Sequence, residues 1–257
     1  MVDAGGFARG IGDISKLQTE YLLKGLSMMG YSVFNLGARD LNNGGMFIKI
    51  LRRKYDLDFL SANIYYKETS RRFSEPYVIK RIKARSKDKK LPFKKLSIGI
   101  VGLCDERSTL FSSRIQEKML EAKDPVEIAR VVIPQVRKKV DLLILLYHGK
   151  YPSLQKILKE VNGVDVVVLG GSYSFRETND DKLPIIVTTP SMGKYAGTLT
   201  LELNKKKRII SHRLQKIALN ESIADDPVFT RLVKEFEKVS KEVRRKATKV
   251  NAKTRSK

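Results

Sequence analysis

The sequence has little of what several classes of protein depend on. Among its 257 residues there is one cysteine, Cys104, which excludes an internal disulfide framework and a zinc site built from paired cysteines. A lone thiol of this kind is typical of a buried side chain. No apolar run approaches the roughly 20 residues that a membrane-spanning helix needs, so no transmembrane segment is expected.

The N-terminus also lacks the basic region and apolar stretch of a signal peptide, which predicts a cytoplasmic location for the chain as written. Residues Met1 to Gly5 (MVDAG), however, are typical of the end of a strand that runs directly into a loop. This abrupt opening leaves a second interpretation, in which a segment before Met1 is missing and the protein is periplasmic or extracellular.

Positive charge is abundant and unevenly placed. The formal net charge is +23, and nearly all of it lies in residues 80–95, 204–216 and 238–257. One interpretation is a polyanion-binding module acting through these basic segments, with nucleic acid, anionic membrane or phosphorylated ligands as partners. The other is solvated loops and a solubilising tail. Aromatic residues near the segments are limited to Tyr77 and Phe93, which favours contacts to a charged backbone over base stacking.

The hydrophobic pattern alternates between strand and helix periods. It predicts helices at 12–29, 42–55, 125–139 and 153–161 and from 226, and strands at 31–36, 59–64, 76–85, 96–103, 140–147, 164–169, 184–188, 197–203 and 209–219. Pro134 inside the third helix predicts a kink or a local break. The alternation indicates an α/β domain with a mixed sheet or a two-sheet sandwich covered by helices.

The composition also suggests a division of the chain. We expect one domain over residues 1–225, a C-terminal helix over 226–248 that frays after Thr248, and a basic disordered tail over 249–257. The predicted buried strands end at glycine-bearing loops. Because ligands in α/β sheets lie beyond the carboxyl ends of strands, the polar residues of these loops are the candidate site residues.

Several short blocks of the sequence, taken together, resemble the motifs of one known protein family. They are residues 2–7 (VDAGGF), 28–40, 60–64 (LSANI), 97–103, 145–149 (LLYHG), 161–174 and 189–197. In this order and with this spacing, over roughly residues 1–205, the chain resembles the metallophosphoesterase, or calcineurin-like, domain of the 5′-nucleotidase family.

The resemblance implies a four-layer αββα sandwich that holds two divalent metals, bridged by an aspartate, at its catalytic centre. A metal-activated hydroxide would attack the phosphorus of a nucleotide or a similar phosphoester. The family's first D-x-H block has no counterpart after Met1, which implies that the first strand is missing. An open sheet edge would result, and a protein partner could complete it.

The same resemblance, carried over residue by residue, leaves most metal ligands without a counterpart. The bridging aspartate falls on Gly6, the asparagine ligand on Ala38 and the catalytic histidine on Arg39. The two histidines of the GGHSH block fall on Ser172 and Ser174. These residues cannot supply the carboxylate and imidazole donors of a two-metal centre.

His148, at the position of the L-x-H block, is the one family ligand that remains. Arg39 could instead hold a phosphate through two parallel hydrogen bonds, and Ser172 and Ser174 could donate to its oxygens. Asp40 could orient Arg39 or His148. Alternatively, Arg39 fills the space left by the metals and pairs with Asp40.

Three functions therefore remain open, and with them whether the chain is an enzyme. The first is a degenerate phosphoesterase domain that needs no cofactor and binds a phosphorylated small molecule. The second is an active hydrolase with an atypical metal site near His148, for which Asp3, Asp40 and Asp105 are the candidate acids and Mn, Zn, Fe or Mg the candidate metals. The third is the polyanion-binding module.

Overall fold

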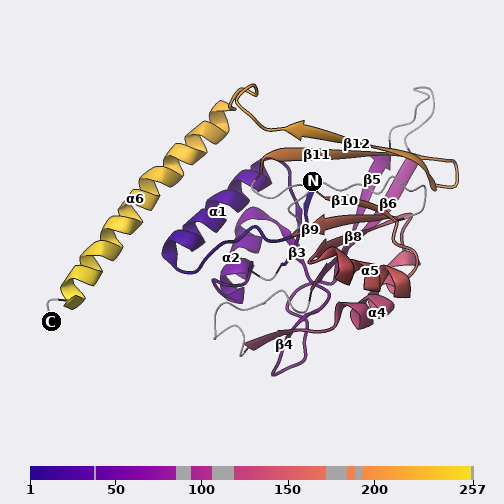
Figure 1. The fold of residues 1–257 in the computed structure, drawn as a ribbon, viewed down its shortest axis with the longest axis horizontal. Helices are drawn as coiled ribbons and strands as arrows, with labels where there is room; N and C mark the ends of the chain where they lie inside the picture. Colours follow the sequence, from indigo (N-terminus) through magenta and orange to yellow (C-terminus); the bar gives the residue numbers. More distant parts are fainter. Residues whose placement is uncertain (38, 85–93, 106–118, 172–183, 189–192, 256–257) are drawn as a thin grey trace.

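The structure, a computed structural model, describes residues 1–37, 39–84, 94–105, 119–171, 184–188 and 193–255, without the side chains of 94 and 249–255. Two sheets lie face to face with helices on their outer sides (Figure 1). This arrangement confirms the predicted four-layer sandwich. Among the helices of these ranges, none combines the length and the apolarity that crossing a bilayer requires.

The first sheet is parallel, and helical crossovers of the kind that parallel strands need connect its members. Its order is β1 (Val2–Asp3), β2 (Val33–Asn35) and β3 (Asp58–Leu60). Helices α1 (Asp13–Met28) and α2 (Gly45–Tyr55) join these strands and cover the outer face. Strand β1 lies at the edge, and within the described residues only β2 pairs with it.

The second sheet has five strands. Its order is β10 (Ile185–Thr188), β9 (Val166–Gly170), β8 (Leu142–His148), β6 (Lys94–Cys104) and β5 (Tyr77–Ala84). Strands β5 and β6 pair antiparallel, as the sequence predicts, and the other neighbours are parallel. The carboxyl ends of β8, β9 and β6 therefore meet at one edge, which is where the candidate site forms.

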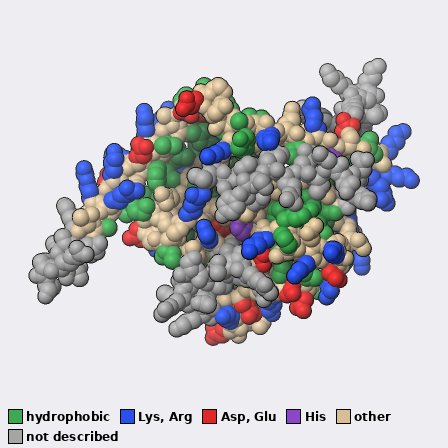
Figure 2. Space-filling model, viewed as in Figure 1, with side chains coloured by type: hydrophobic (Ala, Val, Ile, Leu, Met, Phe, Trp, Pro, Cys, Tyr) green, Lys and Arg blue, Asp and Glu red, His purple; other side chains and the backbone are tan. Residues whose placement is uncertain are grey.

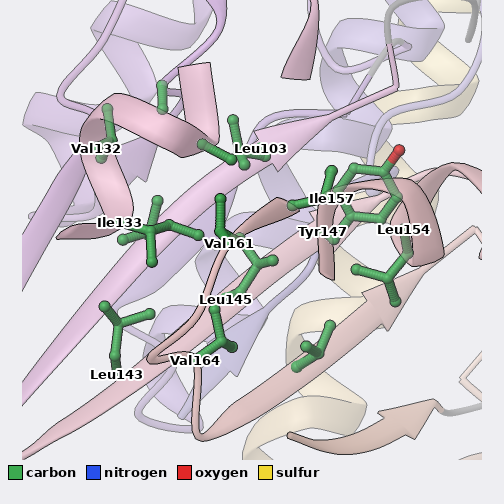
Figure 3. Packing of buried hydrophobic residues seen from close by; sticks show 14 of the residues in the cluster. Leu103, Val132, Ile133, Leu143, Leu145, Tyr147, Leu154, Ile157, Val161 and Val164 are labelled. Atoms are coloured by element: carbon green, nitrogen blue, oxygen red, sulfur yellow. The ribbon is translucent and has the colours of Figure 1, made fainter. Parts of the chain in front are cut away.

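Helices α4 (Pro125–Arg137) and α5 (Tyr151–Glu160) cover the outer face of this sheet. Figure 3 shows their side chains packed against those of β6 and β8. Of the kink or local break predicted at Pro134, the break does not occur, and α4 continues to Arg137. Its neighbours Ile133 and Val136 are fully buried, so packing against the sheet outweighs the hydrogen bond that proline cannot donate.

One predicted strand is divided in two. Residues 59–64 contribute the end of β3 and the start of β4 (Ile64–Tyr66), which pairs with β7 (Leu120–Ala122). Between them the chain leaves the first sheet, since Ser61 N–H donates to the carbonyl of Glu75 and Ala62 N–H to that of Gly102.

The C-terminal part adds a hairpin and a long helix. The hairpin, β11 (Tyr195–Leu203) and β12 (Ile209–Ala218), packs apolar side chains on β8, β9 and β10. Helix α6 (Pro227–Arg255) lies against α1 and extends beyond it (Figure 1). Its backbone stays helical past Thr248, where the sequence predicts fraying. The division into three segments remains a prediction.

Candidate functional site

The site is organised around His148, the last residue of β8. In the sheet register His148 lies between Cys104 of β6 and Gly170 of β9. The loop after β1 and the turn after β2 approach the same point from the first sheet, since Gly6 and Gly37 both contact the imidazole. The ends of five strands thus converge, as the rule for α/β sheets predicts.

The imidazole is wedged between glycines that have no room for a side chain. A Cβ on Gly6 would lie 2.5 Å from Cε1 of His148, and one on Gly37 would lie 2.7 Å from Cγ and Cδ2. A Cβ on Gly170 would lie 3.1 Å from Nδ1. Real Cβ atoms essentially never approach other atoms within 3.0 Å, so glycine at residues 6 and 37 is a condition for this position of the ring.

His148 is held in a state that favours the neutral imidazole. Burial lowers its pKa, and the positive charge of Arg39 acts in the same direction. The carbonyl groups of Ala4 and Gly5 lie near the ring and oppose the shift. Within the described residues, however, the buried Nδ1 atom has no hydrogen-bond partner of good geometry.

Asp40 has a structural role that the sequence does not reveal. Its carboxyl group is buried and accepts three backbone N–H groups: those of Gly6 at 2.7 Å, Gly37 at 2.7 Å and Ala8 at 2.8 Å. It therefore joins the loop after β1 to the turn after β2. Burial raises its pKa to about 7, against the opposing effect of the three donors.

Arg39 and Asp40 do not act as a pair. Arg39 is exposed, and in the described part of the chain its side chain forms no ion pair with Asp40 or any other acid. The expectation that Asp40 orients Arg39 or His148 is wrong, because its carboxyl oxygens are engaged by backbone donors. Arg39 remains available to an anion in solution.

The other candidate acids are also engaged locally. Asp3 accepts the N–H of Gly5 at 2.7 Å, and Asp105 accepts the hydroxyl of Ser153 at 2.9 Å. Ala38, Ser172 and Ser174 lie outside the described residues.

Two buried asparagines at this edge were not singled out from the sequence. Asn35 donates to the carbonyl of Leu103 at 2.8 Å, and Asn63 donates to that of Cys104 at 2.8 Å and accepts its N–H at 3.0 Å. Asn35 ties the first sheet to the end of β6, and Asn63 ties the segment between β3 and β4 to the same strand end. The signal was present, since each amide interrupts an apolar strand sequence (VFNL and SANI).

The described residues do not fit a two-metal centre. Such a centre needs several carboxylate and imidazole donors around each ion. Across the described ranges, no three His, Cys, Asp or Glu side chains lie close enough together to hold a metal ion. His148, the one residue that the resemblance matches to a family ligand, is enclosed by glycines, which supply no side-chain donor.

Comparison of sequences finds several 5′-nucleotidases. The snake venom 5′-nucleotidase of Gloydius brevicauda is 26% identical over 253 residues, covering 88% of this chain and 40% of the venom protein. The 5′-nucleotidase of Bos taurus is 28% identical over 225 residues, covering 79% and 37%. The chain thus spans about two fifths of the length of these relatives. No family model matches it.

Comparison of structures gives the same fold. The calcineurin-like phosphoesterase YfkN from Bacillus subtilis has a TM-score of 0.79 at 17% identity, over 95% of this chain and 84% of that one. A 5′-nucleotidase precursor from Thermus thermophilus has a TM-score of 0.70 at 16% identity, over 92% and 48%. The chain is thus similar in sequence to part of several 5′-nucleotidases, and it shares the fold of the calcineurin-like phosphoesterases.

Proposed function

We propose that this chain is a degenerate 5′-nucleotidase-like domain that does not hydrolyse phosphoesters by the two-metal route and retains an anion-binding role. The observation that supports it most is the contact between His148 and Gly6. The resemblance to the family aligns Gly6 with the bridging aspartate. With the imidazole where it lies, an aspartate side chain at residue 6 would overlap the ring.

The neighbouring acids do not compensate for this loss. A hydroxide-generating centre needs anionic ligands that neutralise two cations. Asp40 directs its carboxyl oxygens at backbone N–H groups, Asp3 bonds to Gly5, and Asp105 bonds to Ser153. Recruiting any of them as a ligand would break these hydrogen bonds and leave buried donors unsatisfied, at about 1–3 kcal/mol each.

Anion binding rests on Arg39. The family aligns this position with its catalytic histidine, beside the scissile phosphate. Arg39 is exposed, has no carboxylate partner among the described residues and lies close enough to His148 to lower its pKa. A guanidinium group in this setting can bind phosphate through two parallel hydrogen bonds.

The test of the degenerate centre measures metal content and turnover together. The purified full chain is dialysed against Mn, Zn, Fe and Mg, analysed by mass spectrometry, and assayed with p-nitrophenyl phosphate, its bis ester and AMP. We expect the protein to retain well below one equivalent of metal. Any background turnover should be the same in the wild-type chain and in the His148→Ala variant. About two equivalents of metal with turnover that His148→Ala abolishes would establish an active hydrolase with an atypical site.

Anion binding is tested separately, by titrating inorganic phosphate and AMP into the protein and following its amide NMR signals. The expected result is saturable shifts around residues 37–40 that Arg39→Gln removes. Arg71→Gln is the matched control, because Arg71 is also exposed and lies in the loop after β4. If Arg39→Gln and Arg71→Gln reduced the phosphate-induced shifts equally, phosphate would be responding only to the net charge of the protein.

A further inference from the structure

Helix α6 is much longer than the helix that supports it. Its 29 residues correspond to a rise of about 43 Å, whereas the 16 residues of α1 rise only about 24 Å. The two helices are antiparallel, since Leu232 contacts the position of Gly25 and the ring of Phe236 lies 5.6 Å from that of Tyr21. One half of α6 therefore extends past α1 (Figure 1).

The half that packs on α1, residues 227–240, has the composition of an ordinary docked helix. It buries Leu232 and Ser240. Its Glu235 accepts hydrogen bonds from Tyr21 at 2.9 Å and Lys24 at 3.2 Å. Acids and bases nearly balance in this half, because two glutamates accompany three basic residues.

The projecting half, residues 241–255, is different. It contains seven Lys or Arg residues and one acid, Glu242. Lys241, Arg244, Arg245 and Lys246 are exposed, and none forms an ion pair within the described part of the chain. Figure 2 shows Lys and Arg side chains along this helix.

We propose that the projecting half of α6 binds double-stranded nucleic acid through its phosphates. The half rises about 22 Å, and a duplex presents one phosphate charge per roughly 1.7 Å of its axis. A helix holds its cations at regular spacing along one axis, so several of them can meet phosphates at once. Phosphate contacts of this kind are insensitive to base sequence.

The composition of the projecting half favours nucleic acid over a membrane surface. Helices that lie in a bilayer interface carry Trp, Phe or Leu on their apolar face. Residues 241–255 contain none of these, and their apolar residues are valine and alanine. The absence of aromatic residues likewise favours contacts with phosphates over stacking on bases.

The other basic segments are less suited to this role. In the hairpin, Lys207 lies 2.8 Å from Asp141, and in β5, Lys80 lies 2.7 Å from Asp58. Part of their charge is thus neutralised within the protein. The cations described at the start of the projecting half, by contrast, are all exposed, and none of them forms such an ion pair.

The test is fluorescence anisotropy of a labelled duplex of about 20 base pairs with the full chain, between about 50 and about 200 mM salt. The variant replaces Arg244, Arg245 and Lys246 with Gln, which preserves helix propensity. The control replaces Lys206, Arg208 and Arg213 of the hairpin with Gln, and so removes the same charge elsewhere. Circular dichroism checks that both variants keep the helical content.

We expect the wild-type chain to bind with a steep salt dependence. The α6 variant should bind at least about tenfold more weakly at about 0.1 M salt, with a slope of log K against log salt reduced by about 2–3, whereas the hairpin control keeps the wild-type slope. The proposal is wrong if the wild-type chain does not bind the duplex at low salt, or if the α6 variant and the hairpin control lose affinity for the duplex equally. It is also wrong if the α6 variant loses binding to phosphatidylserine vesicles but not to the duplex.

Discussion

The imidazole of His148 occupies the space that a side chain on Gly6 would fill. The two residues are 142 positions apart in the sequence, yet a Cβ on Gly6 would lie 2.5 Å from Cε1 of the ring. The ring cannot move aside, because Gly37 contacts its opposite edge. The absence of a side chain at residue 6 and the position of the imidazole are therefore parts of one packing arrangement.

Gly6→Ala should destabilise the protein through this contact. Gly6 has a φ of +85°, so alanine adds backbone strain of about 1–2 kcal/mol as well as the overlap with His148, which we expect to contribute a further ~1–3 kcal/mol. Gly12→Ala is the matched control, because Gly12 has a φ of +98° with nothing within 4 Å of its Cβ position. Urea denaturation measures both variants.

A double-mutant cycle isolates the overlap from the strain. In a His148→Ala background, Gly6→Ala should destabilise no more than Gly12→Ala does in the wild type. A coupling energy near zero between residues 6 and 148 would show that the contact does not constrain the site.

Asp40→Asn should destabilise the protein at about pH 5 although the two side chains have the same shape. The carboxyl group accepts three N–H groups, and an amide nitrogen cannot accept any. At least one buried donor, such as Ala8 N–H, is left unpaired, at about 1–3 kcal/mol. An Asn variant as stable as the wild type would contradict this role.

The stabilities of the wild-type protein and of the Asp40→Asn variant, compared over a range of pH, also measure the titration of Asp40. Its pKa in the folded protein is about 7, above the ordinary value of 3.8, so the folded state binds this proton more tightly than the unfolded chain. Its contribution to stability is full below pH about 4 and is lost as the pH rises through about 7. The difference in unfolding free energy between wild type and Asp40→Asn should therefore shrink over this range.

His148 should titrate below 6.5, the ordinary value for the pKa of histidine, because burial and Arg39 disfavour its charged form. The chain has two histidines, so His148→Gln assigns the two C2–H signals in an NMR titration. Arg39→Gln should move the His148 midpoint upward, whereas Arg71→Gln should not. Because the folded pKa is lowered, the stability that His148 contributes is present above about 6.5 and lost as the pH falls through the folded value.

The attachment of α6 to α1 depends on Leu232. This side chain is 9% exposed, whereas its neighbour Val233 is 55% exposed. Leu232→Ala should weaken docking by about 2–3 kcal/mol, and Val233→Ala by less than about 0.5 kcal/mol. Hydrogen exchange of the α6 amides measures the effect, and equal protection in the two variants would mean that α6 does not rely on this contact.

Much of the fold follows from local pattern. Segments such as 140–147 and 164–169 are so uniformly apolar that only a sheet covered on both faces can bury them, and the structure places β8 and β9 there. The exceptions have tertiary causes. Residues 59–64 divide between two strands because Ser61 and Ala62 bond to other segments, and α4 passes through Pro134 because its neighbours are buried.

The site was predicted less completely. The convergence of the glycine-bearing loops on His148 follows from where the strands end. The partners of Asp40 could not be predicted, because an isolated sequence does not show whether a carboxylate faces a guanidinium or three backbone N–H groups. The sequence does mark Asn35 and Asn63, as amides within apolar strand sequences, but it does not show their partners, because these are backbone groups distant in the sequence.

By itself, the sequence determined most of the order of strands and helices and the resemblance to a family, because these depend on residue identity and local periodicity. Only the tertiary structure decided that the imidazole of His148 lies against Gly6 and Gly37 and that the carboxyl group of Asp40 accepts backbone N–H groups. It also decided that half of α6 projects beyond α1. Those outcomes depend on packing and hydrogen bonds between segments far apart in the chain, which no local pattern encodes.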